Sequence, residues 1–353
     1  MSDNSRMIDS KKMNDFVFKV LVKAGVNKTD SKIVATSLVE GELYGFYSHG
    51  VMRLAHYLKR VKAGTIKKNP KIKIAKKAGC TSLVDGGHGF GHAISMTAVK
   101  EAIKLAGKFG VGMVGVKNSS HFGMAGVIAL EAVKKDMICI AISHTDASVV
   151  PFGGRIPAIG TNPICVAVPC DKKYPVLLDM ATSVASLGKI IVARKKGASV
   201  PSDWGVDADG VPTTDPNKIV YLLPMAGPKG YGLAFIVDIL CGPLTGALFG
   251  VRLPKMYGDY NKFRMLGHMF IVINVKNFVP LKEFKKNVAL MVDDIHNIPP
   301  AKGFSSVMVP GEREFASYEK NKKTGFSLAE ETYADLESIA KEYGVPLNIQ
   351  QKQ

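Results

Sequence analysis

The stretch that decides the fold class reads Val111-Gly-Met-Val-Gly-Val116, Lys117-Asn-Ser-Ser-His121-Phe-Gly123 and Met124-Ala-Gly-Val-Ile-Ala-Leu-Glu-Ala-Val-Lys134. Its first part is a short apolar run with glycine interruptions, which is typical of a buried strand. Its last part has apolar residues at helical spacing and ends in basic residues, which suit the last turn of a helix. Because open α/β sheets bind ligands at the carboxyl ends of strands, this pattern predicts an α/β fold with His121 at a candidate site. A lone histidine in such a turn can also cap the turn or pack against its neighbours.

Length and composition indicate a globular protein of two packed units. The chain has 353 residues, of which 46% are hydrophobic and 22% charged, and such a chain can bury a large core. No apolar segment of signal-peptide type follows the first residues. The longest apolar stretch, 233–250, is interrupted by Asp238, Pro243 and several glycines. It is too broken to span a bilayer, so we expect no membrane partner.

The cysteines and acidic residues give no sign of a metal site. The five cysteines form no C-x-x-C pair, and several lie in strand-like runs (80, 139, 165, 170 and 241). We therefore expect them to be reduced and buried, which favours a cytoplasmic protein without a structural zinc. Asp207-Ala-Asp-Gly210 resembles the start of a calcium loop but lacks the later ligands, so a turn is expected there.

The formal net charge of +17 raises the possibility of nucleic-acid binding. The lysines, however, are spread from Lys11 to Lys352, and the densest segment, 67–77, alternates with isoleucine as a half-exposed strand does. No DNA- or RNA-binding signature accompanies them. We therefore expect no nucleic-acid partner and attribute the charge to attraction of anionic substrates and cofactors.

The N-terminal region, 7–62, is predicted to be helical. Near its end, Ser48 and His49 are expected at a helix start, with Arg53 and Tyr57 following at a spacing of four. His49, Arg53 and Tyr57 would then project from one helical face. A guanidinium matches a carboxylate in two-pronged geometry, so this face suits a small carboxylate ligand. The alternative is a surface helix whose arginine reaches into solvent.

Gly86-Gly-His-Gly-Phe-Gly-His92 follows a predicted strand and precedes a predicted helix. No register of these glycines gives G-x-G-x-x-G, so the dinucleotide fingerprint is absent. A tight turn is expected instead.

Two other segments have features that suit phosphate binding. Asp179 ends a predicted strand and leads into small residues whose amides and hydroxyls could bind phosphate or ribose. Lys229 lies among glycines at the start of a helix, 233–241, that we expect to be buried. A helix start with a nearby cation favours anions, although the segment is not a P-loop. Further along, we predict a central strand at 266–274, a helix at 281–295, a Lys-rich linker after Glu312 and a closing helix at 328–343.

Several motifs in order along the chain resemble the type-2 malate/L-lactate dehydrogenase family. They are Ser48-His-Gly-Val-Met-Arg53, His121-Phe-Gly-Met-Ala-Gly126, Gly160-Thr-Asn-Pro163, Asp179-Met-Ala-Thr-Ser183, Pro212-Thr-Thr-Asp-Pro216, Lys229-Gly-Tyr-Gly-Leu233 and Pro310-Gly-Glu312. Within the family, the stretches 149–154, 227–231 and 256–274 look most similar to ureidoglycolate dehydrogenases. His121-Phe122-Gly123 has the general family form, where ureidoglycolate enzymes can differ.

The resemblance implies an α/β fold with a non-Rossmann cofactor domain of the sulfolactate/malate dehydrogenase-like type. It implies three regions: a helical N-terminal region, 1–75, packed with a C-terminal helical region, 316–353, and an α/β cofactor- and substrate-binding domain, 76–315. It also implies a homodimer or a higher homo-oligomer with sites near the subunit interface.

The same resemblance implies the site residues. His49 and His121 are the candidate acid/base residues, Arg53 would hold the substrate carboxylate with Ser48 and Tyr57 nearby, and Arg264 would reach the substrate from another segment. The residues implied to line the dinucleotide are Thr145, Asp179, Met180, Ala181, Lys229, Gly230, Pro310, Gly311 and Glu312.

The implied reaction is NAD-dependent oxidation of a small 2-hydroxy acid. The favoured substrate is (S)-ureidoglycolate, oxidised to oxalurate in purine nitrogen catabolism. Malate, L-lactate, sulfolactate and imino or keto acids are the alternatives, as is NADP in place of NAD. We expect His121 to be the base, because its ordinary pKa suits neutral pH. We expect His49 to be a donor whose pKa a bound carboxylate raises. A basic binding protein without enzymatic activity is the distant alternative.

Overall fold

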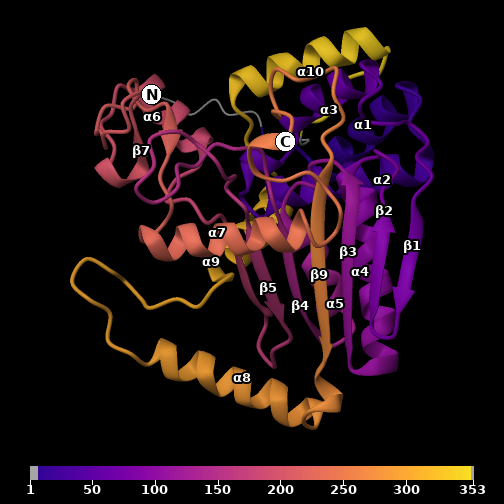
Figure 1. The fold of residues 1–353 in the computed structure, drawn as a ribbon, viewed down its shortest axis with the longest axis vertical. Coiled ribbons are helices and arrows are strands. Elements are labelled where there is room, and N and C mark those ends of the chain that lie inside the picture. The colour runs from indigo at the N-terminus through magenta and orange to yellow at the C-terminus, as the bar shows by residue number, and fades with distance from the viewer. Residues whose placement is uncertain (1–6, 351–353) are drawn as a thin grey trace.

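The computed structural model describes residues 7–350, and within them the chain forms one large mixed sheet (Figure 1). The strand order is β1-β2-β3-β9-β4-β5-β6, and only the β2–β3 pair is parallel. The strands are β1 (Lys73–Ala78), β2 (Thr81–Asp85), β3 (Val111–Ser119), β4 (Met137–Ser143), β5 (Ile164–Val168), β6 (Val176–Met180) and β9 (Leu266–Asn274). The expected last central strand is therefore confirmed as β9, between β3 and β4.

Helices cover both faces of this sheet. Two helices, α4 (Gly91–Phe109) and α5 (Ala125–Val133), pack on one face, and α7 (Pro228–Cys241) crosses the other (Figure 1). The core under α4 and α5 includes Ile94, Val114 and Phe270, all with no exposed surface. Burying such side chains contributes about 1.5–3 kcal/mol each. This rigid core fixes the ends of β3 and β4, from which the site residues emerge.

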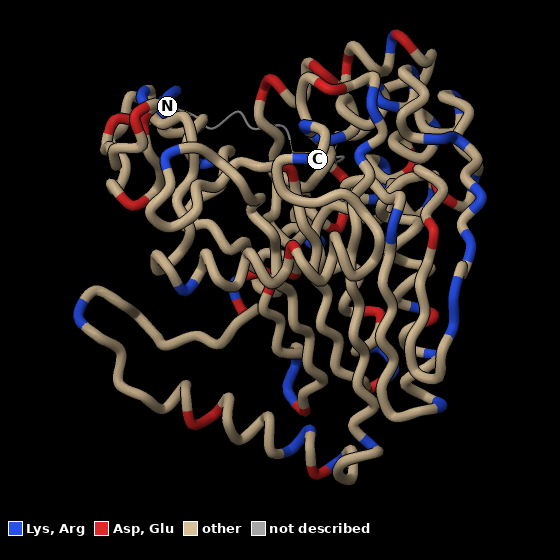
Figure 2. Tube along the Cα trace, in the orientation of Figure 1, with Lys and Arg blue, Asp and Glu red and all other residues tan. Residues whose placement is uncertain are grey.

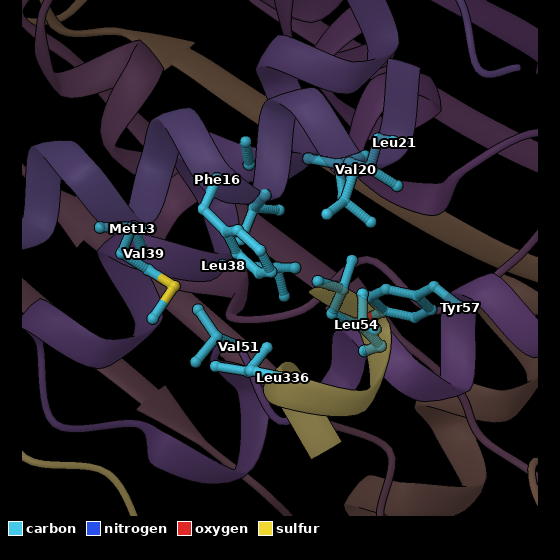
Figure 3. Close-up of a cluster of buried hydrophobic side chains, with 14 of the residues drawn as sticks. Met13, Phe16, Val20, Leu21, Leu38, Val39, Val51, Leu54, Tyr57 and Leu336 are labelled. Atoms are coloured by element: carbon cyan, nitrogen blue, oxygen red, sulfur yellow. The ribbon is translucent and has the colours of Figure 1, made fainter. Parts of the chain in front are cut away.

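A second core joins the two ends of the chain. It lies among α1 (Ser10–Lys23), α2 (Lys28–Leu43), α3 (Arg53–Lys62) and α10 (Glu330–Tyr343), where Leu336 packs against the N-terminal helices (Figure 3). Ile8 pairs in β-bridges with Phe326 and Gln350. Residues far apart in sequence thus share one hydrophobic cluster, which holds α3 beside the sheet.

Three segments differ from the sequence-based expectation. Ser48 and His49 belong to a separate 3-10 turn, η1 (Tyr47–His49), and α3 begins only at Arg53. The expected Lys-rich linker is a helix, α9 (Glu312–Thr324), because Phe315 anchors it in the core. The helix expected to be buried, α7, instead exposes Leu233, Phe235 and Ile236.

The remaining elements surround the sheet. They are η2 (Ser202–Trp204), η3 (Gly250–Arg252), η4 (Val275–Asn277), α6 (Leu187–Lys196), α8 (Leu281–His296), and the two-stranded β7 (Gly205–Val206) and β8 (Tyr221–Leu222). Lysines and arginines are distributed over many elements, including the edge strand β1, whereas α7 is almost free of charge (Figure 2). No helix within residues 7–350 is long and apolar enough to cross a membrane.

Candidate active site

His121 follows the end of β3, where the ladder with β9 is irregular between Val116 and Ser119. Its Nδ1 lies 2.7 Å from the hydroxyl oxygen of Tyr57 on α3. The ring of His49 is stacked beside it, with ring centroids 5.3 Å apart. The end of β3, the η1 turn and α3 therefore meet, and the His121 ring contacts both the Tyr57 phenol and the His49 ring.

The glycine-rich run before α4 shapes this point. Gly87 and His88 have positive φ and form a turn rather than a phosphate loop. Gly91, the first residue of α4, lies so close to the Ser120 and His121 carbonyl groups that a Cβ would overlap them. The glycine thus lets α4 pack directly against the backbone that carries His121.

Arg53 begins α3 and points back toward η1. Its Nε donates to the Ser48 carbonyl at 2.5 Å, and its guanidinium also donates to the Tyr257 hydroxyl. The Ser48 hydroxyl lies 2.9 Å from Nδ1 of His49. Although His49 is not on the α3 helix, the turn brings Ser48, His49, Arg53 and Tyr57 together.

Burial and neighbouring positive charge keep both site histidines neutral. Burial, and then the Arg53 guanidinium, lower the pKa of His49 to about 4. Burial, and then His49 and Arg53, lower the pKa of His121 well below its usual range. The expected rise in the pKa of His49 therefore requires the negative charge of a bound carboxylate, which would have to outweigh both effects.

The charge of Arg264 is paired within the chain. It is buried and paired with Asp146 at 2.6 Å, and it donates to the Pro254 carbonyl. The Asp146 carboxylate also accepts a hydrogen bond from the backbone of Met256 at 3.0 Å. Arg264 thus holds the 253–265 segment through Nη1 and Nη2, whereas its buried Nε has no hydrogen-bond partner within residues 7–350.

The expected cofactor residues lie along a continuous hydrogen-bonded network. The Thr145 hydroxyl accepts from the backbone of Thr161 at 3.1 Å, and the Thr182 hydroxyl donates to the Thr161 carbonyl at 3.0 Å. The Thr182 carbonyl accepts from Met225, just before α7. The segments that follow β4 and β6, with Thr145 and Ala181, are thereby connected through Thr182 and Met225 to the start of α7, which carries Lys229 and Gly230.

Asp179 lies on β6, directly opposite the start of α5. Its carboxylate accepts a hydrogen bond from the Gly126 backbone at 2.7 Å. Burial raises its pKa to about 7, although the Gly126 hydrogen bond opposes the rise. A buried carboxyl group with spare acceptor capacity can bind hydroxyl groups of a sugar.

The Pro310–Glu312 segment lies against the same strand. The Pro310 carbonyl accepts from the Leu177 backbone at 3.0 Å, and Gly311, at φ +99°, packs on Leu177. The Glu312 carboxylate, however, pairs with His296 of α8 at 2.7 Å and caps the Val309 backbone. The segment thus contacts the Asp179 strand, but its acidic side chain is directed to α8.

Sequence reasoning missed three residues at this site. Tyr257 contacts Arg53, Asp146 pairs with Arg264, and buried Arg60 binds the carbonyl groups of 255–262. Asp146 follows Thr145 at a strand end, a position that could have indicated it. Nothing local marks Tyr257 or Arg60. Within residues 7–350, no group of three or more His, Cys, Asp or Glu side chains could hold a metal ion.

Fold and site together define an α/β protein in which two histidines, a tyrosine and an arginine cluster where β3 ends and α3 begins. Residues 8–337 match the family described as malate/L-lactate dehydrogenase. The chain belongs to this family of dehydrogenases.

Relatives and solved structures cover nearly the whole chain. It is 40% identical to the L-sulfolactate dehydrogenase of Methanocaldococcus jannaschii, over 95% of this chain and 96% of that one. It is 33% identical to the ureidoglycolate dehydrogenase (NAD(+)) of Escherichia coli, over 94% and 95%. The crystal structure of malate dehydrogenase from Entamoeba histolytica superposes with a TM-score of 0.93 at 32% identity, covering 98% of this chain and all of that one. The expected family and fold class are confirmed. Relatives named for NAD(+) and for NADP(+) both occur, which supports a nicotinamide cofactor.

Proposed function

We propose that this protein oxidises a small 2-hydroxy acid, transferring hydride to a nicotinamide dinucleotide. The observation that carries the proposal is the cluster of His121, Tyr57, His49 and Arg53, in which neutral imidazoles lie beside a guanidinium. A base and a carboxylate-binding cation in one pocket are what alcohol oxidation next to a carboxylate requires.

In the proposed reaction Arg53 holds the carboxylate and His121 takes the hydroxyl proton. Nδ1 of His121 contacts the Tyr57 hydroxyl, so Nε2 is the ring nitrogen proposed to act as the base. For Nε2 to be the base, Nδ1 carries the ring proton and donates it to the Tyr57 hydroxyl oxygen. The Gly123 N–H donates to Nδ1 at 3.3 Å, so this hydrogen bond must be given up in the tautomer that makes Nε2 the base. With the Ser48 hydroxyl donating to its Nδ1, neutral His49 carries its proton on Nε2 and can donate to the substrate.

A bound nicotinamide dinucleotide would supply the acceptor for the hydride that leaves the carbinol carbon. The chain fits such a cofactor: α7 begins at Pro228 after Gly227, has no side-chain cap and carries Lys229 in its first turn, which suits a pyrophosphate. The Asp179 carboxyl group, whose pKa burial raises to about 7, suits a ribose hydroxyl. We propose that the other cofactor contacts come from Thr145, Met180, Ala181, Gly230 and Pro310–Glu312. We propose NAD over NADP. A kcat/KM preference of more than about tenfold for NADP, about 1.4 kcal/mol, would reverse that choice.

The substrate remains among three acids that relatives of this chain use. The sequence stretches quoted above favour (S)-ureidoglycolate, with oxalurate as product and a role in purine nitrogen catabolism. The more similar L-sulfolactate relative and the malate dehydrogenase fold match favour L-sulfolactate or malate. We propose the malate and sulfolactate type first and ureidoglycolate second, because the larger identity is the stronger support.

A substrate panel tests the proposal. Formation of NADH or NADPH would be followed by the absorbance of the reduced nicotinamide at about 340 nm. The substrates would be malate, sulfolactate, ureidoglycolate and lactate. Activity with at least one of them is expected. Absence of turnover with all four and both cofactors would refute the proposed function, and absence with ureidoglycolate alone would remove only that substrate.

We also propose a homodimer or higher homo-oligomer. The outward face of α7 exposes Phe235 and Ile236 at 48% and 53%, and α8 exposes Met291 at 67%. The α8 helix and the segment after it project from the body of the molecule (Figure 1). A second copy is the proposed occupant, since a flat apolar face and a projecting arm on one chain can be self-complementary. Light scattering should give at least twice the chain mass, and a monomer at micromolar concentration would refute this. The unpaired, mostly buried cysteines support a cytoplasmic location.

A further inference from the structure

Tyr257 lies on an irregular segment between η3 and β9, residues 253–265, which we call the 253–265 loop. Its hydroxyl accepts a hydrogen bond from the Arg53 guanidinium, and the Arg53 Cζ lies 5.9 Å from its ring centroid. Tyr257 is 54% exposed, and its hydroxyl lies beside the residue proposed to hold the substrate.

We propose that the Tyr257 hydroxyl recognises the substrate's distal group and selects 2-hydroxy acids that carry a hydrogen-bond acceptor there. This inference rests on the proposed function. A carboxylate, a sulfonate or a ureido carbonyl group would satisfy it, whereas the methyl group of lactate would not. Tyr257 is therefore a specificity-determining residue.

Donor and acceptor counting supports this role. A phenol has one proton to donate and can also accept. Because the Tyr257 oxygen accepts from Arg53, its own proton is left for a ligand. Arg53 is proposed to bind the carboxylate at one end of a small acid. The Tyr257 hydroxyl, next to the guanidinium, can then donate to a group at the other end. Arg264, the nearby alternative cation, already binds Asp146 and the Pro254 carbonyl, although its buried Nε has no partner within residues 7–350.

Arg60 positions Tyr257 by binding the backbone of the 253–265 loop. It lies near the end of α3, two turns after Arg53, and only 1% of its surface is exposed. Its guanidinium donates to the carbonyl oxygens of Lys255, Met256 and Lys262 at 3.1, 2.8 and 3.2 Å. The α3 helix thus carries Arg53, the proposed carboxylate-binding residue, at its start, and Arg60, which binds the loop, near its end.

Other contacts fix the backbone on both sides of Tyr257. The Met256 N–H donates to Asp146 at 3.0 Å, and the Thr65 hydroxyl donates to the Tyr260 carbonyl at 3.0 Å. The Tyr257 ring also lies edge-on to His56, with centroids 5.2 Å apart. The hydroxyl is therefore held in place before any ligand binds, so little ordering free energy is lost on binding.

The test compares Tyr257→Phe with Tyr260→Phe in the full chain. Tyr257→Phe keeps the ring and removes only the hydroxyl. Tyr260 is the matched control because its ring lies on the same loop and its hydroxyl contacts His56 instead. For each protein, kcat and KM would be measured with L-lactate and with the best substrate among malate, sulfolactate and ureidoglycolate.

Tyr257→Phe should lower kcat/KM for the acceptor-bearing acid about tenfold or more, mainly through KM, as expected for one lost hydrogen bond to a charged group. It should leave lactate within about twofold, and Tyr260→Phe should leave both substrates within about twofold. Equal losses on both substrates, an unchanged preference, or a wild type that uses lactate as well as the other acids would overturn the inference. A wild type inactive on every acid would instead refute the proposed function itself. An unchanged melting temperature for Tyr257→Phe would show that its fold is intact.

Discussion

At the scale of single residues, His121 and Arg53 have separable roles in the proposed reaction. Replacing His121 by Ala should lower kcat about 10²- to 10⁴-fold, because the proton acceptor is lost. NADH binding, measured by fluorescence titration, should be retained. Arg53→Ala should chiefly raise KM, because it removes ground-state binding of the carboxylate. If His49→Ala abolished turnover while His121→Ala cost only a few-fold, the roles of the two histidines would be exchanged.

Gly91 is a second position where one atom matters. A Cβ there would overlap the Ser120 and His121 carbonyl groups, so Gly91→Ala should displace the backbone that carries His121. Overpacking of this kind costs about 1–3 kcal/mol, and kcat should fall as well. Thermal unfolding and kinetics would measure both. Gly107→Ala on the same helix is the control, since a Cβ there meets nothing within 4 Å. Equal behaviour of the two variants would contradict the close-packing argument.

At the scale of elements, α3 and the 253–265 loop act as a pair. Arg60→Gln should loosen the loop because the charge-assisted hydrogen bonds to its carbonyl groups are lost, each worth about 1.5–3 kcal/mol. Trypsin should then cut faster at Lys255 and Lys262, and KM for the substrate should rise while NADH binding is kept. Lys62→Gln, on the same helix but exposed and paired with Glu342, is the control. Unchanged cleavage in Arg60→Gln would show that other contacts hold the loop.

At the scale of the whole molecule, buried neutral histidines make stability depend on pH. Burial lowers the pKa of His56, His92 and His268 to about 3, and His49 and His121 shift in the same direction. In the unfolded chain these imidazoles take up protons below about pH 6.5, whereas in the folded chain they do not. Each histidine therefore lowers the free energy of unfolding by up to about 1.4 kcal/mol for every pH unit below that value. The stability that they contribute is present above pH 6.5 and is lost as pH falls toward their folded pKa values.

The carboxyl groups of Glu42 and Asp179 oppose this effect, because burial raises their pKa to about 8 and about 7. A raised carboxyl pKa favours the folded state as pH falls. The histidines outnumber them, so the melting temperature should drop between pH 6.5 and pH 5. Scanning calorimetry across that range would measure it, and a flat or rising melting temperature would contradict the burial of neutral histidines.

Local sequence pattern determined the elements and the family. Alternating and helical apolar spacing defined the bounds of β2, β4 and β9 because those segments bury a full face. The pattern was wrong for α9, which was expected to be a linker. Its sequence is mostly polar, and the helix is held by a few apolar side chains such as Phe315 that pack into the core. The pattern was also wrong for α7. An apolar sequence predicts burial, but it does not show whether other parts of the same chain cover the helix, and here they leave one face exposed.

Only the tertiary structure decided how the candidate site is assembled. Spacing of four placed Arg53 and Tyr57 on one face, but His49 reaches them through a turn, and His121 arrives from 64 positions beyond Tyr57. Tyr257 and Arg60 have no local signal because their partners lie about two hundred residues away in sequence, 204 for Arg53 and Tyr257. The sequence could identify which side chains have the required chemistry. The packing of α3 against the loop and the sheet determines which of them meet, since long-range contacts depend on the whole core.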